Sequence, residues 1–282
     1  MSALPADLPR QVEAALREDL GSGDVTASLV PAAKRVHGSV ITREAAVLCG
    51  RPWADETFRQ LDPQVQLSWQ AADGDRIAPG QILFSIAGPA RAVLTGERTA
   101  LNFLQLLSGT ATATRGFVDA VAGTRCRILD TRKTVPGLRT AQKYAVRCGG
   151  AQNLRMGLYD QVLIKENHIA AAGSLTAAIE AARRNAAGLA IEVEVETLTE
   201  LQEALDARPD IIMLDEFSLE DMRSAVALNR AQGAAAKLEV SGSVSLETVQ
   251  SIAATGVDYI SVGALTKHVR AIDLSMRLDF RG

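Results

Sequence analysis

Cysteine is scarce in this chain, and its cysteines follow no recognisable spacing. The 282 residues include three, Cys49, Cys126 and Cys148, and no Cys-x-x-Cys pair. A disulfide framework or a structural zinc site is normally built from more cysteines at closer spacing. The sequence therefore predicts neither of them, and a reducing cytoplasm is the expected compartment.

Long apolar runs and a strong excess of one charge are also missing. No stretch approaches the ~20 apolar residues of a membrane span, and Asp7, Glu13 and Glu18 stand where a secretory signal would be basic and then apolar. The formal net charge is −3 and the pI is near 5.7, which disfavours a broad basic surface. We therefore expect a soluble protein that binds neither nucleic acid nor a membrane.

The basic residues gather in one segment. Between positions 130 and 165, seven Lys or Arg residues stand against two acids. They are Arg132, Lys133, Arg139, Lys143, Arg147, Arg155 and Lys165. Because the chain as a whole is nearly balanced in charge, this segment predicts a pocket for a small ligand that carries several negative charges.

Short β-like runs alternate with helical segments from about Arg125 onward. The predicted strands are 126–130, 161–164, 190–195, 211–214, 238–240 and 258–262. The predicted helices between the later strands are 175–187, 198–207, 219–230 and 246–255. Repeated βα units predict a parallel sheet. Polar groups or glycine follow all six strands, and because strand ends converge on one mouth in a (β/α) barrel, this pattern favours a TIM-like barrel over an open doubly wound sheet.

The first ~110 residues predict a smaller α+β unit. Its expected strands lie at 36–48, 65–70 and 82–86, and its expected helices at 52–60 and 90–107. We take Ser108-Gly109 as the end of the long helix and as the domain boundary. The expected domains are an N-terminal one at 1–108, with the tail 271–282 packing against it, and a barrel domain at 109–270.

Eight ordered motifs spread over nearly the whole chain resemble those of the quinolinate phosphoribosyltransferases, also called carboxylating nicotinate-nucleotide pyrophosphorylases. The motifs are Asp24-Val25-Thr26, 95–102 (TGERTALN), 130–134 (DTRKT), 157–160 (GLYD), 163–168 (LIKENH), 192–195 (EVEV), Leu214-Asp215 and Ser261-Val262-Gly263. The resemblance implies a small N-terminal α/β sandwich and an open (β/α) barrel. It also implies a homodimer with shared active sites, which can assemble further, in which one subunit's N-terminal domain covers the other's barrel mouth.

The resemblance implies a reaction that joins quinolinate to the ribose of phosphoribosyl pyrophosphate and gives nicotinate mononucleotide, pyrophosphate and CO₂, a step of NAD biosynthesis. The residues it implies for the quinolinate carboxylates are Arg132, Arg155, Lys165 and Arg98, the last from the partner subunit. Arg is suited to this role because a guanidinium can meet a carboxylate with two parallel hydrogen bonds.

Four residues are implied as catalytic: Lys133, Lys165, Glu194 and Asp215. Glu194 and Asp215 are expected to hold the ribose hydroxyls or a Mg²⁺ ion, directly or through water. The substrate-binding groups that remain are Thr131 and two loops expected to bind phosphate, Ser241-Gly242-Ser243 and Val262-Gly263-Ala264. Glu192, Glu194 and Glu196 alternate along one predicted strand, which fits either a solvated edge or a buried polar face.

One position departs from the family pattern. The family usually reads Asn-His-Arg where this chain reads Asn153-Leu154-Arg155, and a leucine side chain cannot donate a hydrogen bond. This leaves two alternatives to quinolinate transfer: a related phosphoribosyltransferase for another aromatic acid, or a Schiff-base barrel lyase that uses Lys165 as its nucleophile. His168 is expected to cap or pack, or else to contact substrate. A non-enzymatic anion-binding protein is disfavoured, because Glu194 and Asp215 would repel an anion.

Overall fold

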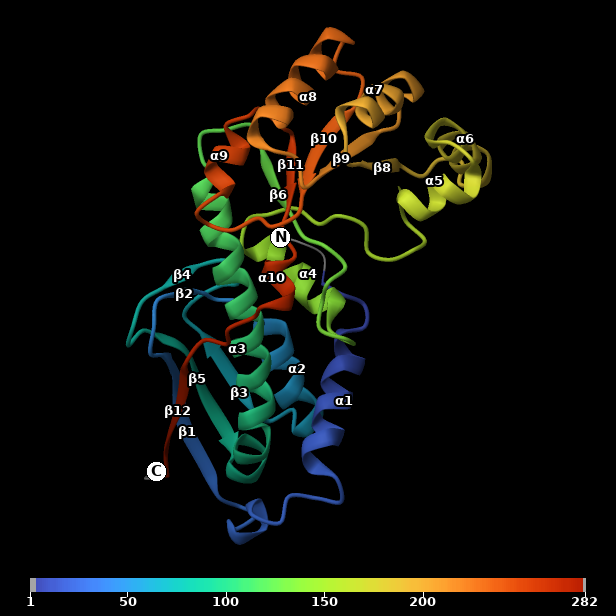
Figure 1. Cartoon of the computed structure of the whole chain (residues 1–282). Coiled ribbons are helices and arrows are strands. Elements are labelled where there is room, and N and C mark those ends of the chain that lie inside the picture. Colours follow the sequence, from blue (N-terminus) through green and yellow to red (C-terminus); the bar gives the residue numbers. More distant parts are fainter. Residues whose placement is uncertain (1–3, 281–282) are drawn as a thin grey trace. The chain divides into compact units, whose positions relative to one another are not determined.

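The computed structural model describes residues 4–280 and divides into two compact units (Figure 1). Unit 1 combines the chain up to Arg115 with Thr134–Gly150 and the chain from Leu265 onward, and unit 2 combines Gly116–Lys133 with Ala151–Ala264. The two units are interleaved along the sequence, and the domain boundary at position 108 stays a prediction. Among residues 4–280, none of the helices has both the length and the apolar character needed to cross a membrane.

Unit 1 is built on an antiparallel sheet with strand order β12-β1-β5-β3. Its strands are β1 (Arg35–Thr42), β3 (Gln66–Trp69), β5 (Ile82–Pro89) and β12 (Leu274–Asp279), with a separate pair β2 (Ala46–Val47) and β4 (Arg76–Ile77). Its helices are α1 (Leu8–Leu20), the 3-10 turn η1 (Ala27–Leu29), α2 (Arg51–Leu61), α3 (Ala90–Ala120) and α4 (Arg139–Cys148), with α3 continuing into unit 2.

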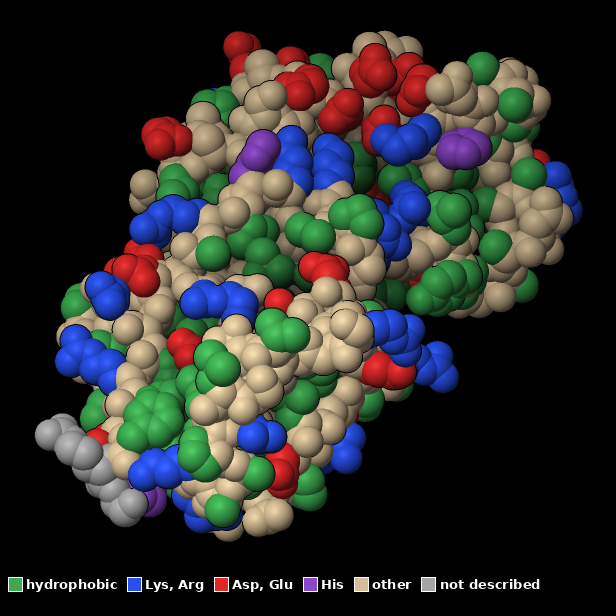
Figure 2. All heavy atoms as spheres, turned by 90° about the horizontal axis from the view of Figure 1, so that it is seen from below, with side chains coloured by type: hydrophobic (Ala, Val, Ile, Leu, Met, Phe, Trp, Pro, Cys, Tyr) green, Lys and Arg blue, Asp and Glu red, His purple; other side chains and the backbone are tan. Residues whose placement is uncertain are grey.

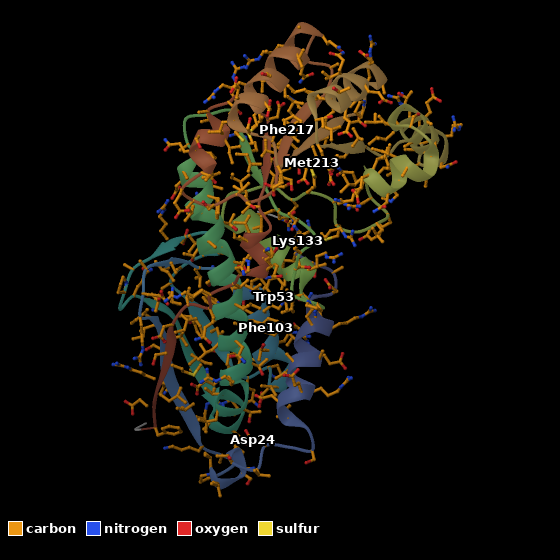
Figure 3. The ribbon with its side chains drawn as sticks, viewed as in Figure 1. Asp24, Trp53, Phe103, Lys133, Met213 and Phe217 are labelled. Atoms are coloured by element: carbon orange, nitrogen blue, oxygen red, sulfur yellow. The ribbon has the colours of Figure 1, made fainter. Side chains whose placement is uncertain are left out.

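Two apolar clusters hold unit 1 together. One joins the inner face of the sheet to α3 through fully buried residues such as Phe84, Leu101 and Leu104. The other surrounds Trp53, whose ring lies 5.3 Å from that of Tyr144. Burying an aromatic or aliphatic side chain of this size contributes about 1.5–3 kcal/mol to folding, so these clusters are the main stabilising element of the unit. Trp53 is labelled in Figure 3.

The predicted end of the long helix at Ser108-Gly109 is wrong, because α3 continues to Ala120. The Ser108 hydroxyl is satisfied inside the helix, since it accepts the Cys49 N–H at 2.8 Å and donates to the Cys49 carbonyl at 3.0 Å. Gly109 is required by a neighbour: a Cβ atom at this position would lie 2.2 Å from the carbonyl oxygen of Arg270. The glycine therefore allows a close approach of backbone and does not end the helix.

Unit 2 contains a six-stranded parallel sheet with strand order β6-β11-β10-β9-β8-β7. Its strands are β6 (Arg127–Leu129), β7 (Val162–Ile164), β8 (Ile191–Val195), β9 (Ile211–Asp215), β10 (Lys237–Ser241) and β11 (Tyr259–Ser261). Its helices are α5 (Glu166–Ala172), α6 (Leu175–Asn185), α7 (Leu198–Ala207), α8 (Leu219–Ala231) and α9 (Val249–Ala253), and the short α10 (Ala264–Lys267) begins at its last residue.

The strand order confirms the open (β/α) barrel. Each strand from β7 to β11 lies beside the next one along the chain, and the first strand, β6, pairs with the last, β11. All six predicted strands are present, and α6, α7 and α8 agree closely with the predicted helices. The helix predicted at 246–255 is shorter, because Ser245 and Thr248 form a hydrogen-bonded turn before α9 begins at Val249.

Candidate active site

The parallel sheet has one apolar and one polar face, because successive side chains of a strand point to opposite sides. The apolar face is formed by every second residue of each strand, and these residues are buried: Val193, Val195, Ile212, Leu214, Leu238, Val240 and Ile260. The polar face is formed by the alternate positions, which include Glu192, Glu194, Met213, Asp215, Glu239, Ser241 and Ser261. In-register pairing places Glu194, Met213 and Glu239 side by side across β8, β9 and β10, with Met213 marked in Figure 3.

An ion pair joins two of the predicted catalytic residues at the carboxyl ends of neighbouring strands. Lys165 follows β7 directly, and Glu194 lies near the end of β8 on the same face of the sheet. The Lys165 Nζ donates to Glu194 Oε2 at 2.5 Å. The Glu194 side chain is only 9% exposed, whereas that of Lys165 is 44% exposed. The ammonium therefore stands toward solvent and is held by a carboxylate beneath it.

The loops after β6 and β11 bring three further predicted residues together. The Thr131 hydroxyl accepts the Lys133 N–H at 3.0 Å, which shapes the turn after β6. A Cβ atom on Gly263 would lie 3.1 Å from Lys133 Cδ and 3.6 Å from Thr131 Oγ1. A side chain at position 263 would therefore press on Lys133, and glycine leaves room for the lysine beside the backbone of the loop. Lys133 is labelled in Figure 3.

Asp130 organises the loop that carries Arg155, one of the predicted quinolinate contacts. It is fully buried, and its two oxygens accept the Leu154 N–H at 2.9 Å and the Asn153 Nδ2 at 2.6 Å. The next residue, Arg155, is half-buried. Burial and then the neighbouring Arg132 guanidinium lower the pKa of Arg155, so two arginines stand close enough to repel each other. Two like charges held together in this way suit a ligand with two negative charges.

Two glutamates lie fully buried in the polar face, on β8 and β10. The Glu192 Oε2 accepts a hydrogen bond from Gln161 at 2.7 Å, and a Glu239 oxygen accepts one from the Ser261 hydroxyl. Among residues 4–280 the second oxygen of each carboxyl finds no hydrogen-bond partner. Burial, and then the charge of Glu239, raise the pKa of Glu192 to about 9, and burial raises the pKa of Glu239 to about 7.

The buried carboxyl of Glu192 makes stability fall toward alkaline pH. Its pKa is about 9 in the folded chain against an ordinary value of 4.5, so the folded state binds more protons between these values. Such a group can remove up to about 1.4 kcal/mol of unfolding free energy per pH unit as pH rises through that window. We expect Glu192→Gln, which cannot titrate, to flatten the dependence of unfolding free energy on pH, measured by urea denaturation between pH 6 and 9.

Glu196→Gln is the matched control, since Glu196 follows the same strand but is exposed. Its curve should run parallel to that of the parent chain. Parallel curves for Glu192→Gln and the parent would show instead that Glu192 is already ionised in the folded protein.

The loop after β10 contains the predicted residues Ser241, Gly242 and Ser243. Gly242 has φ +124°, a conformation that residues with a side chain rarely adopt. A Cβ atom there would lie 2.8 Å from Glu216 Oε1, and the Ser243 hydroxyl donates to the same oxygen at 3.5 Å. This loop does not open directly onto a helix, because α9 begins only at Val249. The loop 262–264, in contrast, leads straight into α10.

His168 acts as a helix cap. Its Nδ1 accepts the Lys165 N–H at 3.0 Å, which satisfies a backbone donor at the start of α5. The capping role expected as one of two possibilities is confirmed. By fixing the backbone of Lys165, His168 also helps to position the lysine of the ion pair.

Comparison with known proteins finds matches that cover both units. The quinolinate phosphoribosyl transferase N-terminal domain matches residues 24–108, and the C-terminal domain of the same family matches residues 110–277. The chain belongs to the quinolinate phosphoribosyltransferase family. The fold and the family predicted from the sequence are thereby confirmed.

Relatives of this family match nearly from end to end. The nicotinate-nucleotide pyrophosphorylase [carboxylating] of Mycobacterium leprae is 45% identical over 273 residues, which is 95% of each chain. A probable enzyme of the same name from Bacillus subtilis is 42% identical over 260 residues, covering 92% of this chain and 89% of its own. The solved structure of the nicotinate-nucleotide pyrophosphorylase from Francisella tularensis superposes with a TM-score of 0.94 at 46% identity, covering 98% of each chain.

Arg98 is the one predicted site residue of this transferase that lies outside unit 2. It is exposed on α3 in unit 1. The other predicted residues lie in unit 2, and all of them except Arg155 are near the carboxyl ends of strands or in the loops that follow those strands. Arg155 lies in the loop between α4 and β7.

Sequence reasoning missed two glutamates of the site, Glu239 and Glu216. Glu239 stands between Leu238 and Val240, and a single acid inside an apolar strand is the signal that could have found it. Glu216 has φ +52°, an uncommon backbone conformation for a residue with a side chain, and no sequence pattern shows it. For Glu192 and Glu194, the structure decides in favour of the buried polar face over the solvated edge.

Proposed function

We propose that this chain transfers the phosphoribosyl group of phosphoribosyl pyrophosphate to quinolinate with loss of CO₂, giving nicotinate mononucleotide and pyrophosphate. The observation that carries the proposal is the Lys165–Glu194 pair, held at 2.5 Å at the carboxyl ends of a parallel sheet in a member of this family. In this proposal the pair offers a cation to a substrate carboxylate and, beside it, an anion to a developing ribosyl cation. The relatives named as carboxylating or decarboxylating enzymes support the same reaction.

The quinolinate carboxylates are assigned to Arg132, Arg155 and Lys165. Two guanidiniums and an ammonium can meet a planar dicarboxylate in a fixed orientation. A fourth cation, Arg98, is assigned to the site of a second subunit in a homodimer. Both arginines and the lysine lose water contacts when the ligand enters, which strengthens each charge-assisted hydrogen bond.

The ribose is assigned to two acidic residues and the leaving pyrophosphate to a lysine. Glu194 and Asp215 end adjacent strands on the same face and can hold the ribose hydroxyls. Lys133, beside Gly263, can neutralise the pyrophosphate as it departs. The carboxylate oxygens of Glu194 and Asp215 are also ligands of the kind that Mg²⁺ prefers, and Mg²⁺ when bound would offset the negative charge of the pyrophosphate. The 5′-phosphate is assigned to backbone N–H groups of the Gly242 loop and of the Gly263 loop.

The bond changes follow from this placement. The pyridine nitrogen of quinolinate attacks C1 of the ribose, the bond from C1 to pyrophosphate breaks, and Glu194 stabilises the positive charge on the ribose as it develops. The product nitrogen is positively charged and can accept the electron pair of the adjacent carbon. The carboxylate on that carbon therefore leaves as CO₂, and a proton takes its place.

The decisive assay measures CO₂ and pyrophosphate together. We expect both products in equal amounts from quinolinate, phosphoribosyl pyrophosphate and Mg²⁺, and no CO₂ from nicotinate, which lacks the second carboxylate. Pyrophosphate release with another aromatic acid but not with quinolinate would overturn the assignment of the substrate while keeping the transferase.

Leu154 bears directly on the substrate. Its N–H is held by Asp130, so the side chain at this position projects from a fixed backbone in the loop of Arg155. We expect Leu154→His to lower the KM or Kd for quinolinate by one to two decades, because a charge-assisted hydrogen bond contributes about 1.5–3 kcal/mol. The constants for phosphoribosyl pyrophosphate should change little, because the residues assigned to its phosphates and ribose are untouched. Any effect on kcat should be secondary, since a contact made equally in ground and transition states alters binding more than the chemical step.

Leu158→His is the control, because Leu158 lies in the same loop but is 76% exposed. It should leave both constants unchanged. Unchanged or weaker quinolinate binding in Leu154→His would indicate a pocket already adapted to leucine, and would favour a different aromatic acid as the natural substrate.

The Schiff-base alternative is tested separately. The ion pair presents Lys165 as an ammonium, whereas imine formation needs the neutral amine. We expect borohydride with a carbonyl substrate to leave Lys165 unmodified, as judged by peptide mass.

A further inference from the structure

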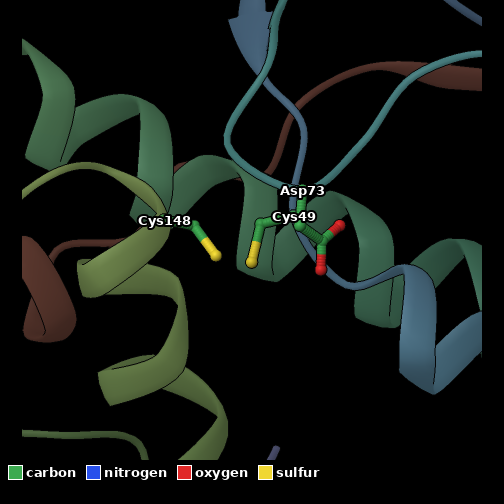
Figure 4. Close-up of side chains that lie close together, drawn as sticks. All are labelled: Cys49, Asp73 and Cys148. Atoms are coloured by element: carbon green, nitrogen blue, oxygen red, sulfur yellow. The ribbon is translucent and has the colours of Figure 1, made fainter. Parts of the chain in front are cut away.

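Two of the three cysteines meet in unit 1, although they are far apart in the sequence. Cys49 stands just before α2, and Cys148 is the last residue of α4. Asp73, in the turn between β3 and β4, lies beside them (Figure 4). The two Sγ atoms and a carboxylate oxygen of Asp73 all lie within 4.8 Å of one another. Cys49 is fully buried, while Cys148 and Asp73 are half-buried, so the group can be reached from one side.

The backbone around Cys49 and Asp73 is held by hydrogen bonds to other segments. The Cys49 N–H and carbonyl are both bonded to Ser108, at 2.8 and 3.0 Å. The turn of Asp73 is tied to the strand before Cys49, since the Gly74 N–H donates to the Leu48 carbonyl at 2.8 Å. The site is therefore pre-formed on three segments and does not depend on a mobile loop.

Asp73 is oriented by partners of its own. Its Oδ2 accepts the Tyr144 hydroxyl at 2.8 Å and its Oδ1 accepts the Arg51 N–H at 3.2 Å. The ring of Tyr144 is held in turn against Trp53. Hydrogen-bonded carboxylates of this kind are typical of metal sites, in which a second layer of residues aims the ligands.

The three ligand groups carry the negative charge that a divalent cation needs. Cysteine binds a metal ion as the thiolate, so one divalent cation would displace the protons of both thiols. Two thiolates and the Asp73 carboxylate together would then offset the charge of the ion.

We propose that Cys49, Asp73 and Cys148 form a binding site for a thiophilic divalent cation, with Zn²⁺ as the ion that fits best. Tetrahedral Zn²⁺ has bonds of about 2.3 Å to sulfur and 2.0–2.2 Å to oxygen, which separates its ligand atoms by roughly 3.5–3.8 Å. The observed group reaches that spacing with movements of about 1 Å or less. Two sulfur ligands select against Mg²⁺, which needs oxygen. The fourth position is left to water, on the half-exposed side.

Such an ion would link the start of α2, the β3–β4 turn and the end of α4. It lies in unit 1, separate from the carboxylates of unit 2 to which Mg²⁺ is assigned. Its role would be to stabilise unit 1, and its loss should be detectable without any measurement of turnover.

Cobalt titration of the full-length, reduced and metal-free protein tests the site. We expect the thiolate-to-cobalt charge-transfer absorption to saturate at one thiolate-bound Co²⁺ per chain, with release of two protons. Zn²⁺ should abolish the absorption and raise the thermal unfolding midpoint, whereas excess Mg²⁺ should do neither. Cys148→Ser should weaken binding at least a hundredfold, and Asp73→Asn about tenfold to a hundredfold.

Cys126→Ser is the matched control, because Cys126 is a buried cysteine of unit 2 that takes no part in the group. It should bind Co²⁺ like the parent. Circular dichroism identifies any variant that fails to fold, and the conservative Asp73→Asn then carries the test. The proposal is overturned if the reduced parent gives no charge-transfer absorption, if Cys148→Ser retains it, or if Cys126→Ser loses it.

Discussion

Lys165→Ala and Lys133→Ala are each expected to lower turnover at least a hundredfold while leaving the fold intact. Lys165 is held by Glu194 at the end of β7, and Lys133 lies against Gly263 in the loop after β6. Removing one pre-positioned charge that stabilises a transition state costs about 10²–10³ in rate. Initial rates with quinolinate and phosphoribosyl pyrophosphate, measured together with circular dichroism, check both variants.

Lys237→Ala provides a control on the same sheet. Lys237 begins β10, at the amino end, where its ammonium bonds to Asp258 at 2.8 Å on the exposed surface. An exposed pair of this kind contributes little, and the variant should keep its activity. Activity within about threefold of the parent for Lys165→Ala or Lys133→Ala, well short of the tenfold that ~1.4 kcal/mol represents, would remove that residue from the site.

Mixing Arg98→Ala and Lys165→Ala chains is expected to restore activity that neither chain has alone. If Arg98 serves the site of the partner subunit, a hybrid dimer contains one site with both residues and one with neither. Random exchange makes half of the dimers hybrids, so about a quarter of the parent activity should return. The measurement is the initial rate of the mixture against the two separate variants.

In the control experiment, Lys165→Ala chains are mixed with Arg17→Ala chains in place of Arg98→Ala chains. Arg17 is an exposed arginine of α1 in unit 1 that pairs with Glu13, and its loss should leave turnover unchanged. Differently tagged chains establish that subunits exchange. A mixture that exchanges its subunits and yet stays inactive would rule out the shared site.

The barrel was predictable because its signals are local. Each strand of unit 2 is a short apolar run bounded by polar or glycine residues, and α7 was predicted at its observed bounds because its apolar residues recur at helical spacing. Parallel strands end at one edge of a sheet, so the residues after them could be grouped before any coordinates were known. The Lys165–Glu194 pair is a direct result of that rule.

The sequence was misleading about the end of the long helix, because the same short pattern can have two physical causes. Ser108-Gly109 looks like a helix end, yet the serine is bonded to Cys49 and the glycine is required by the Arg270 carbonyl. Both causes are contacts with residues far away in the chain. No pattern within a short window could distinguish them from a helix end.

The sequence by itself determined the family, the parallel sheet and the positions of the charged residues at its strand ends, because these depend on periodicity and on motifs of a few residues. Only the tertiary structure decided which acids are buried, that Leu274–Asp279 pairs with β1, and that Cys49, Asp73 and Cys148 meet. Cysteine spacing along the chain argued against a zinc site, but spacing predicts ligands only when neighbours in sequence form the site. Here three distant segments do so, and their meeting is a property of the packed fold.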